Sequence, residues 1–208
     1  MPGTGASMSG VEANVTLVLT AIAGYLVGSI PAANLVARRR RMDLRDVGDR
    51  NPGYWNAKAT LGRRAAAPVF ILDAAKGAVA AMIGVLLAAD GDWWVGYVGA
   101  GAAMIGHAWP VFARFRGGRS VLTFAGAVCV LSPLTALAAI ALLLIVTAAT
   151  RSFAWGARAG VFGFPLIQLL TDGAHCTAAT GCLMAIIGAR FAMAALIDTS
   201  APATTDAA

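Results

Sequence analysis

Two short stretches of the sequence combine arginine with glycine, and each lies directly beside a long apolar segment. The first covers residues 49–56, with sequence DRNPGYWN, and the second covers residues 115–120, with sequence FRGGRS. Arginine presents a permanently charged fork of donors, and glycine lets backbone N–H groups approach an anion without a side chain in the way. These stretches predict a phosphate-binding site at a membrane surface.

The second stretch carries the sharper signal, because two arginines flank two consecutive glycines. Arg116 and Arg119 would bind phosphate, and Gly117 and Gly118 would each leave a backbone N–H group accessible. A helix beginning near Ser120 would point its positive end at the same place. We predict that both arginines are catalytic and that both glycines bind substrate.

Further polar residues beside these stretches are candidates for the same site. The aromatic residues of the first stretch are surrounded by Asn51, Gly53, Asn56 and Lys58. We predict that these four residues bind substrate, and a structural turn is the alternative. His107 is a third catalytic candidate, because it could orient a substrate oxygen; its alternative role is a structural hydrogen bond at the membrane interface.

Three charged residues lie within apolar segments, where a charge is costly and usually faces a polar interior. Asp73 and Lys76 are three residues apart, so they share one helix face. They form either a functional pair or a structural ion pair. The same alternatives apply to Arg190, which either acts in function or extends along its helix to reach the membrane interface.

The composition is that of a membrane protein. Of the 208 residues, 59% are hydrophobic and 12% are charged, and the mean hydropathy is +0.73. The net charge of +6 comes from arginines beside the apolar segments, so it favours membrane orientation over nucleic-acid binding. The three cysteines show no CxxC spacing and no histidine-rich partner set, so we predict neither a metal site nor a cofactor.

The apolar segments predict an all-α, polytopic membrane helix bundle with about seven transmembrane helices, about five or six being the alternative. Residues 121–150 would measure about 45 Å as one helix, which is too long for one crossing, so Ser132-Pro133 favours two helices that turn there. Gly28-Ser29-Ile30-Pro31 breaks the first helix near its end. The predicted helices cover residues 14–37, 65–89, 93–113, 121–131, 134–150, 159–171 and 178–197.

Charge asymmetry orients the predicted bundle. Residues 38–64 contain nine Lys or Arg and three Asp, residues 114–119 contain three Arg, and residues 151–158 contain two. With seven crossings these loops share one side, and the opposite side carries no Lys or Arg. The positive-inside rule then places the basic motif loops in the cytosol and the N-terminus outside.

The same reading divides the chain into three parts. We predict a short external segment over residues 1–13, a single transmembrane domain over residues 14–197 and a disordered tail over residues 198–208.

In the two stretches that combine arginine with glycine, and in the segments around them, the chain resembles the PlsY family, the bacterial acyl-phosphate:glycerol-3-phosphate acyltransferases. The resemblance runs at consistent spacing over roughly residues 20–160, and the combination of motifs is specific although each piece alone would be weak. It rests on Gly28-Ser29-Ile30-Pro31, Val47-Gly48, Asn51, Gly53, Asn56, Thr60-Leu61-Gly62, Leu72-Asp73, Lys76-Gly77, Gly106-His107, Pro110, Phe112, the run from Phe115 to Arg119, and Thr150-Arg151.

The resemblance implies a seven-helix fold in the inner membrane of a bacterium, with the motif loops in the cytosol. It implies acyl transfer from acyl phosphate to the 1-hydroxyl of glycerol 3-phosphate, giving lysophosphatidate in phospholipid biosynthesis. Arg151 would assist in binding substrate, and membrane lipids would surround the protein. The sequence does not identify a protein partner.

The chain departs from the family pattern at several positions. Asp49 stands where the first motif has Ser, and Ala59 stands where it has Arg. Ala154, Ala189 and Ala192 stand where later motifs have Ser, His and Asn. The alternative function is therefore a catalytically silent paralogue that binds phosphorylated lipid precursors or partners an active subunit. A small transporter with the intramembrane charges on its ion path is a third.

Overall fold

The computed structural model describes residues 10–89 and 91–200, and its regular elements are all helical over those residues. The predicted all-α fold is confirmed. The predicted external segment and tail lie partly outside the described residues, as does Asp90. The elements are α1 (Gly10–Gly28), α2 (Ala32–Arg38), α3 (Tyr54–Leu61), α4 (Arg63–Leu87), α5 (Trp94–Ala108), the 3-10 helix η1 (Val111–Ala113), α6 (Val121–Leu131), α7 (Pro133–Thr150), α8 (Phe153–Thr171) and α9 (Gly173–Ser200).

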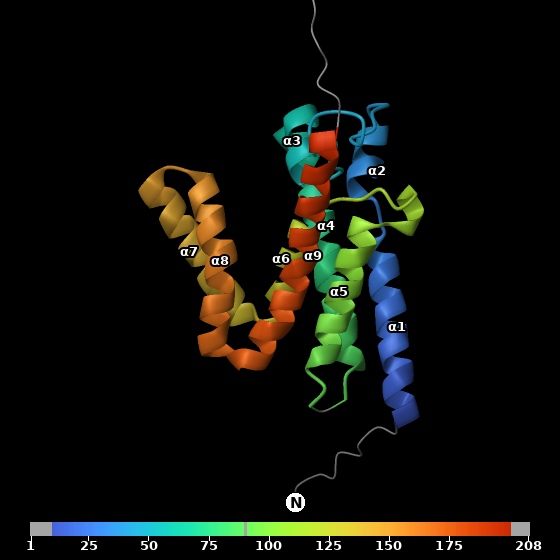
Figure 1. Cartoon of the computed structure of the whole chain (residues 1–208), viewed down its shortest axis with the longest axis vertical. Helices are drawn as coiled ribbons and strands as arrows, with labels where there is room; N and C mark the ends of the chain where they lie inside the picture. The colour runs from blue at the N-terminus through green and yellow to red at the C-terminus, as the bar shows by residue number, and fades with distance from the viewer. Residues whose placement is uncertain (1–9, 90, 201–208) are drawn as a thin grey trace, which may run out of the picture.

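Within the described part of the chain, five helical segments are long and apolar enough to cross a membrane. They are Gly10–Arg38, Arg63–Leu87, Pro133–Thr150, Phe153–Thr171 and Gly173–Leu196. Helices α5 and α6 have 15 and 11 residues, fewer than a typical crossing needs. Both pack along α4, so they belong to the same bundle (Figure 1).

Both predicted helix interruptions are present in the structure, each next to a proline. Helix α1 ends at Gly28, and α2 begins at Ala32, directly after Pro31. Ser132 separates α6 from α7, and Pro133 occupies the start of α7, where a backbone N–H group would have no partner within the helix.

Several predicted helix boundaries were wrong. Helix α1 begins at Gly10 rather than residue 14, α8 begins at Phe153 rather than residue 159, and α9 begins at Gly173 rather than residue 178. Residues 198–200, predicted as tail, belong to α9. Arg158 was expected in a loop, but it lies on α8 with Cζ 5.1 Å from the centroid of the Trp155 ring, a contact that lets a cation remain on an interfacial helix.

The predicted third helix also ended too late. Helix α5 ends at Ala108, because Pro110 follows closely and cannot donate a helical hydrogen bond. Residues 111–113 form the short helix η1 instead.

Glycines bring α4 and α6 into backbone contact. A Cβ atom at Gly77 of α4 would overlap the carbonyl oxygen of Thr123, and a Cβ atom at Gly126 of α6 would overlap the carbonyl oxygen of Ala74. Contacts between small residues of this kind hold helices together in lipid, where apolar surface alone gives little driving force.

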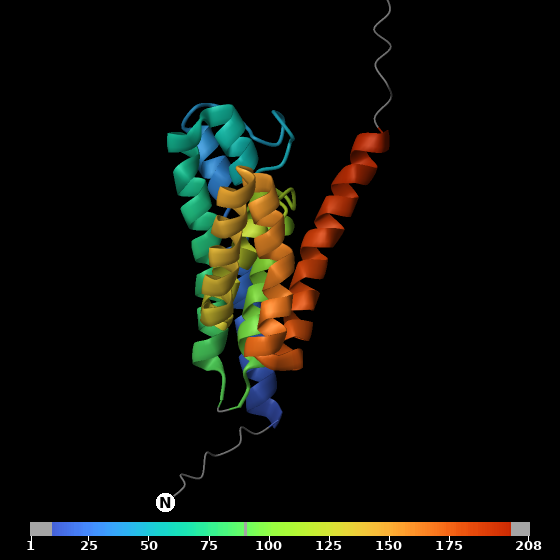
Figure 2. The ribbon, with the colours of Figure 1, turned by 90° about the vertical axis from the view of Figure 1, so that its left-hand side faces the viewer.

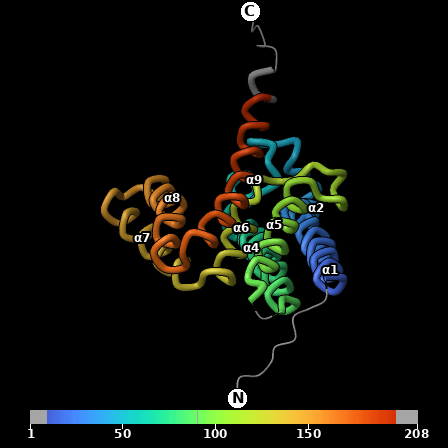
Figure 3. Tube along the Cα trace, turned by 60° about the horizontal axis from the view of Figure 1, so that its bottom comes forward, coloured from blue at the N-terminus to red at the C-terminus, as the bar shows by residue number. Residues whose placement is uncertain are grey.

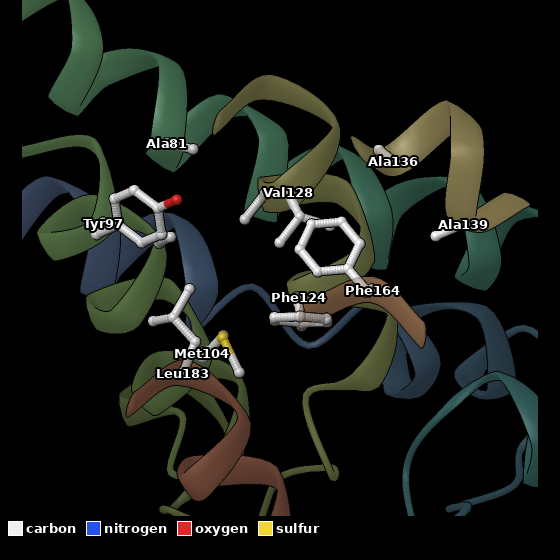
Figure 4. Close-up of a cluster of buried hydrophobic side chains, with 11 residues drawn as sticks. Ala81, Tyr97, Met104, Phe124, Val128, Ala136, Ala139, Phe164 and Leu183 are labelled. Carbon is white, nitrogen blue, oxygen red and sulfur yellow. The ribbon is translucent and has the colours of Figure 1, made fainter. Parts of the chain in front are cut away.

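Larger side chains fill the space beside these close contacts. Phe124 of α6 and Phe164 of α8 meet edge to face, with ring centroids 6.1 Å apart (Figure 4). Met104 of α5 and Leu183 of α9 join the same buried cluster. This cluster therefore connects α5 and α6 to α8 and α9.

Helices α7 and α8 form a hairpin that stands beside the rest of the bundle (Figures 1 and 3). A buried polar contact ties its lower end to the other helices: Gln168 Nε2 donates hydrogen bonds to Ser132 Oγ at 2.7 Å and to Tyr97 Oη at 3.1 Å. Figure 2 shows that α9 diverges from α7 and α8, and that the separation increases toward the C-terminal end of α9. Helix α9 thereby reaches the loops at the upper end of the bundle.

The basic segments gather at that upper end. Helices α2 and α3, the segment following α5 and the turn between α7 and α8 all lie there, whereas the start of α1 and the turn between α4 and α5 lie at the opposite end (Figure 1).

Candidate substrate cavity

A cavity of about 360 Å³ opens at the basic end, between two loops and the C-terminal part of α9. We call it the arginine cavity. Among the residues that the structure describes, Asp49 is its only acidic lining residue. A concave surface with many guanidinium groups and little opposing charge attracts and binds phosphorylated ligands. Its arginines are Arg45, Arg50, Arg116, Arg119 and Arg190.

Four of the predicted site residues line this cavity: Asn51, Arg116, Gly117 and Arg119. Nη1 of Arg119 lies 3.3 Å from Asp49 Oδ2, and its guanidinium Cζ lies 4.7 Å above the centroid of the Phe191 ring. The structure thus brings together the two arginine-bearing stretches that are about 65 residues apart in the chain.

The Gly117–Gly118 segment is held between α5 and α9. The N–H group of Gly118 donates to the carbonyl oxygen of His107 at 3.0 Å, so it is not free for an anion as the sequence had predicted. Arg190 donates from Nε to the Gly118 carbonyl at 3.1 Å and from Nη2 to the Gly117 carbonyl at 2.9 Å. Arg190 therefore fixes this loop as well as lining the cavity.

The first loop is fixed by a local ion pair. Arg45 donates bidentate hydrogen bonds to the Asp43 carboxylate, and it also donates to the Ala113 carbonyl oxygen at 3.1 Å. The hydrogen bonds from Arg45 are the main reason that the pKa of Asp43 is lowered from 3.8 to about 2. Arg45 thereby connects the loop before α3 to η1.

Asn56 is not an exposed loop residue but a buried residue of α3. Its Nδ2 donates to the carbonyl oxygens of Leu44 and Val47, at 2.8 and 2.9 Å, and its Oδ1 accepts from Thr60 at 3.1 Å. Its polar atoms are thus used to shape the loop that carries Asn51.

The remaining predicted residues lie outside the lining of the arginine cavity. Gly53 precedes α3 in an extended conformation. Lys58 lies on α3 with Nζ 4.8 Å from the centroid of the Trp55 ring. Arg151 is exposed in the turn between α7 and α8. His107 and Gly118 line a smaller neighbouring space, which Arg116 and Gly117 also line.

A buried charged group also lines this smaller space. Lys76 Nζ is 2.8 Å from Asp73 Oδ1, with side chains only 5% and 3% exposed, and His107 Nδ1 is 3.6 Å from the same oxygen. The Lys76–Asp73 contact is close in distance but lies outside hydrogen-bond angles, so it is an ion pair. Lys76 also donates to the Ile30 carbonyl at 3.3 Å, which joins α4 to the break after α1.

Comparison with known proteins shows the family of the chain. The protein-family model described as glycerol-3-phosphate acyltransferase matches residues 18–198, most of the chain. The chain belongs to this family. The resemblance inferred from the motifs is thereby confirmed.

Individual relatives agree with this assignment. The glycerol-3-phosphate acyltransferase of Thermoanaerobacter pseudethanolicus is 40% identical over 155 residues, which is 74% of this chain and 76% of the relative. The one from Geobacter sulfurreducens is 39% identical over 150 residues, covering 72% and 76%.

The fold is also similar to crystal structures of PlsY, an integral membrane glycerol 3-phosphate acyltransferase. Its glycerol 3-phosphate form has a TM-score of 0.74 and 29% identity, covering 84% of this chain and 87% of that one. Its lysophosphatidic acid form has a TM-score of 0.72 and 27% identity. With five apolar helices of spanning length among the described residues, this family member is a multi-pass membrane protein.

The backbone of this family member is strained around the cavity. Arg50, Arg114, Phe115 and Ser120 all have positive φ, between 54° and 61°, although none is glycine. Such conformations are costly and concentrate at functional sites, where the surrounding structure enforces them.

The sequence predicted Arg116 and Arg119 as site residues but missed the other three arginines that line the cavity, Arg45, Arg50 and Arg190. Arg45 was counted only as a basic loop residue, although its partner Asp43 stands two positions earlier. For Arg190, the sequence left open a functional role inside the bundle and simple extension to the interface. The signal for Arg190 was its place as a single charge in an apolar stretch of α9, which in a membrane favours an internal partner.

Proposed function

We propose that this protein transfers an acyl group from acyl phosphate to the 1-hydroxyl of glycerol 3-phosphate, giving lysophosphatidate for phospholipid biosynthesis. The family supports the acyltransferase class, and the names of the matched PlsY structures support glycerol 3-phosphate as acceptor. The observation that carries the proposal is the arginine cavity, in which Arg116 and Arg119 flank Gly117 beside Asn51.

The chemistry requires little from the protein beyond binding and charge stabilisation. Acyl phosphate is a mixed anhydride, so its carbonyl is already activated. The glycerol hydroxyl attacks this carbonyl, an ester C–O bond forms, and the C–O bond to phosphate breaks; in the overall balance the hydroxyl proton leaves with inorganic phosphate. The arginines align two phosphorylated substrates and stabilise negative charge on the attacked carbonyl.

The site residues divide into two groups. Arg116 and Arg119 contact the reacting groups, and Asn51 and Gly117 bind substrate beside them. The others support these four: the His107 carbonyl accepts the N–H group of Gly118 and so holds the glycine segment, and Asn56 and Gly53 shape the first loop. Lys58 and Arg151 lie at the same end of the bundle and attract anionic substrates toward it.

We further propose seven crossings of a bacterial inner membrane, with the N-terminus outside and the cavity facing the cytosol. A reporter fused after Asp92 is expected to lie outside, and one fused after Phe115 is expected to lie inside, because α5 separates them and the basic segments favour the cytosol. Paired fusions to a periplasm-active and a cytosol-active reporter measure this. If both positions report the same side, the seven-crossing arrangement is wrong.

Complementation tests the reaction. The chain is expected to restore growth to a strain that lacks its own glycerol-3-phosphate acyltransferase, whereas Arg119→Ala is expected not to. Losing one charge-assisted contact to phosphate lowers turnover by about tenfold to more than a hundredfold.

Arg158→Ala is the matched control for Arg119→Ala, because Arg158 is an exposed arginine that stacks on Trp155 and does not line the cavity. It should complement as well as the wild type. Failure of the wild type to complement despite normal membrane expression would favour the catalytically silent alternative.

A further inference from the structure

Asp49 is the one carboxylate that lines the arginine cavity among the described residues, and its position bears on which acceptor the cavity selects. We propose that Asp49 is a specificity-determining residue: its carboxylate accepts a hydrogen bond from the 2-hydroxyl of the acceptor, while the arginines hold the acceptor's phosphate. This inference rests on the proposed function and deepens it.

The contact between Asp49 and Arg119 is suited to being exchanged. The two side chains are 45% and 26% exposed, and the distance of 3.3 Å is longer than the roughly 2.7–2.9 Å of a strong charge-assisted hydrogen bond. Exposed ion pairs of this kind contribute little to stability. A phosphate group, with more oxygens and more charge, can therefore take Arg119 from Asp49.

Asp49 stays at the cavity when Arg119 leaves it. Its other oxygen, Oδ1, accepts the backbone N–H of Asn51 at 3.1 Å. The backbone on either side is turned by Gly48, with φ of 62°, and by Arg50, with φ of 55°. The loop thus presents one carboxylate oxygen to the ligand without help from Arg119.

The chemistry of an ionised carboxylate determines what that oxygen can bind. It has acceptors only, so it repels phosphate oxygens and binds O–H groups. Five guanidinium groups and one carboxylate in the same cavity fit a ligand that is anionic at one end and hydroxylated at the other. Glycerol 3-phosphate has both features, whereas inorganic phosphate has no carbon-bound hydroxyl.

Three ligands separate this role from that of a simple counter-ion for Arg119. Equilibrium binding to the purified protein in detergent is measured with glycerol 3-phosphate, with 3-hydroxypropyl phosphate, which lacks the 2-hydroxyl, and with inorganic phosphate. The variants are Asp49→Ala and Asp49→Asn. Asp46→Ala is the matched control, because Asp46 is an exposed aspartate of the same loop that does not line the cavity.

We expect Asp49→Ala to bind inorganic phosphate more tightly than the wild type but glycerol 3-phosphate about tenfold more weakly, since a hydrogen bond to a charged group is lost. The preference for glycerol 3-phosphate over 3-hydroxypropyl phosphate should fall toward unity. Asp49→Asn keeps a neutral acceptor and should retain part of that preference, and Asp46→Ala should match the wild type.

Each other outcome gives a definite answer. If Asp49→Ala tightens all three ligands by a similar factor, Asp49 is only a counter-ion and the inference is wrong. If the preference depends on Asp49 but the wild type transfers no acyl group, the proposed reaction fails while the role of Asp49 stands. If the wild type turns over and the preference survives Asp49→Ala, the inference alone fails. A wild type that binds none of the ligands overturns both.

Discussion

Gly117→Ala is expected to lower acyl transfer by about a hundredfold or more while the protein still inserts into the membrane. An added Cβ would overlap the carbonyl oxygen of His107 and crowd Pro110, so the segment must move away from α5. A displacement of roughly 1 Å in a group that positions substrate costs about a hundredfold in rate. Steady-state turnover of acyl phosphate and glycerol 3-phosphate by the purified protein measures the effect.

Gly181→Ala is the matched control for this change. Gly181 lies within α9, and a Cβ there would meet nothing within 4 Å. Its turnover should equal that of the wild type, because the added methyl group displaces nothing and alanine is well tolerated within a helix. Wild-type turnover in Gly117→Ala would show that the position of the glycine segment does not limit catalysis.

Asp73→Ala is expected to lower the free energy of unfolding by about 3–5 kcal/mol, since it leaves the Lys76 ammonium group buried without its carboxylate. The ammonium would retain the Ile30 carbonyl as partner, but that contact is longer, at 3.3 Å. Denaturant titration of the purified protein, followed by far-UV circular dichroism, gives the difference from wild type.

The double variant Asp73→Ala with Lys76→Ala distinguishes the two roles predicted for this pair. Removing both charges should recover most of the lost stability, because no unpaired charge remains. If turnover recovers with stability, the pair is structural. If the stable double variant stays inactive, the pair acts in function. A single variant Asp73→Ala as stable as the wild type would show that this buried pair contributes no net stability.

The features that the sequence predicted well are those with local causes. Pro31 and Pro133 interrupt helices because proline lacks a backbone donor, and both breaks occur where the structure has them. The all-α membrane class followed from apolar length alone. The joint position of Asn51, Arg116 and Arg119 was predicted because their loops shared one side of the charge pattern.

The features that it missed depend on contacts between distant segments. Arg190 bonds to carbonyl groups more than 70 residues earlier in the chain, at Gly117 and Gly118, and no local pattern encodes that pairing. Asn56 has a polar amide side chain of the kind that binds ligands from loops. In the structure it lies in α3, and its amide donates to the Leu44 carbonyl oxygen instead. His107 was placed near the site correctly in sequence, yet the fold sets the glycine segment between it and the arginine cavity.

The backbone contact between α4 and α6 means that entering the membrane and assembling within it are encoded by different residues. Outward-facing leucines such as Leu144 and Leu170 need only be apolar, since fluid lipid adapts to any shape. Gly77 and Gly126 must lack even one methyl group, because a neighbouring backbone occupies that space. A chain that kept every large apolar residue but lost these two glycines would insert normally, but its α4 and α6 could no longer pack with their backbones in contact.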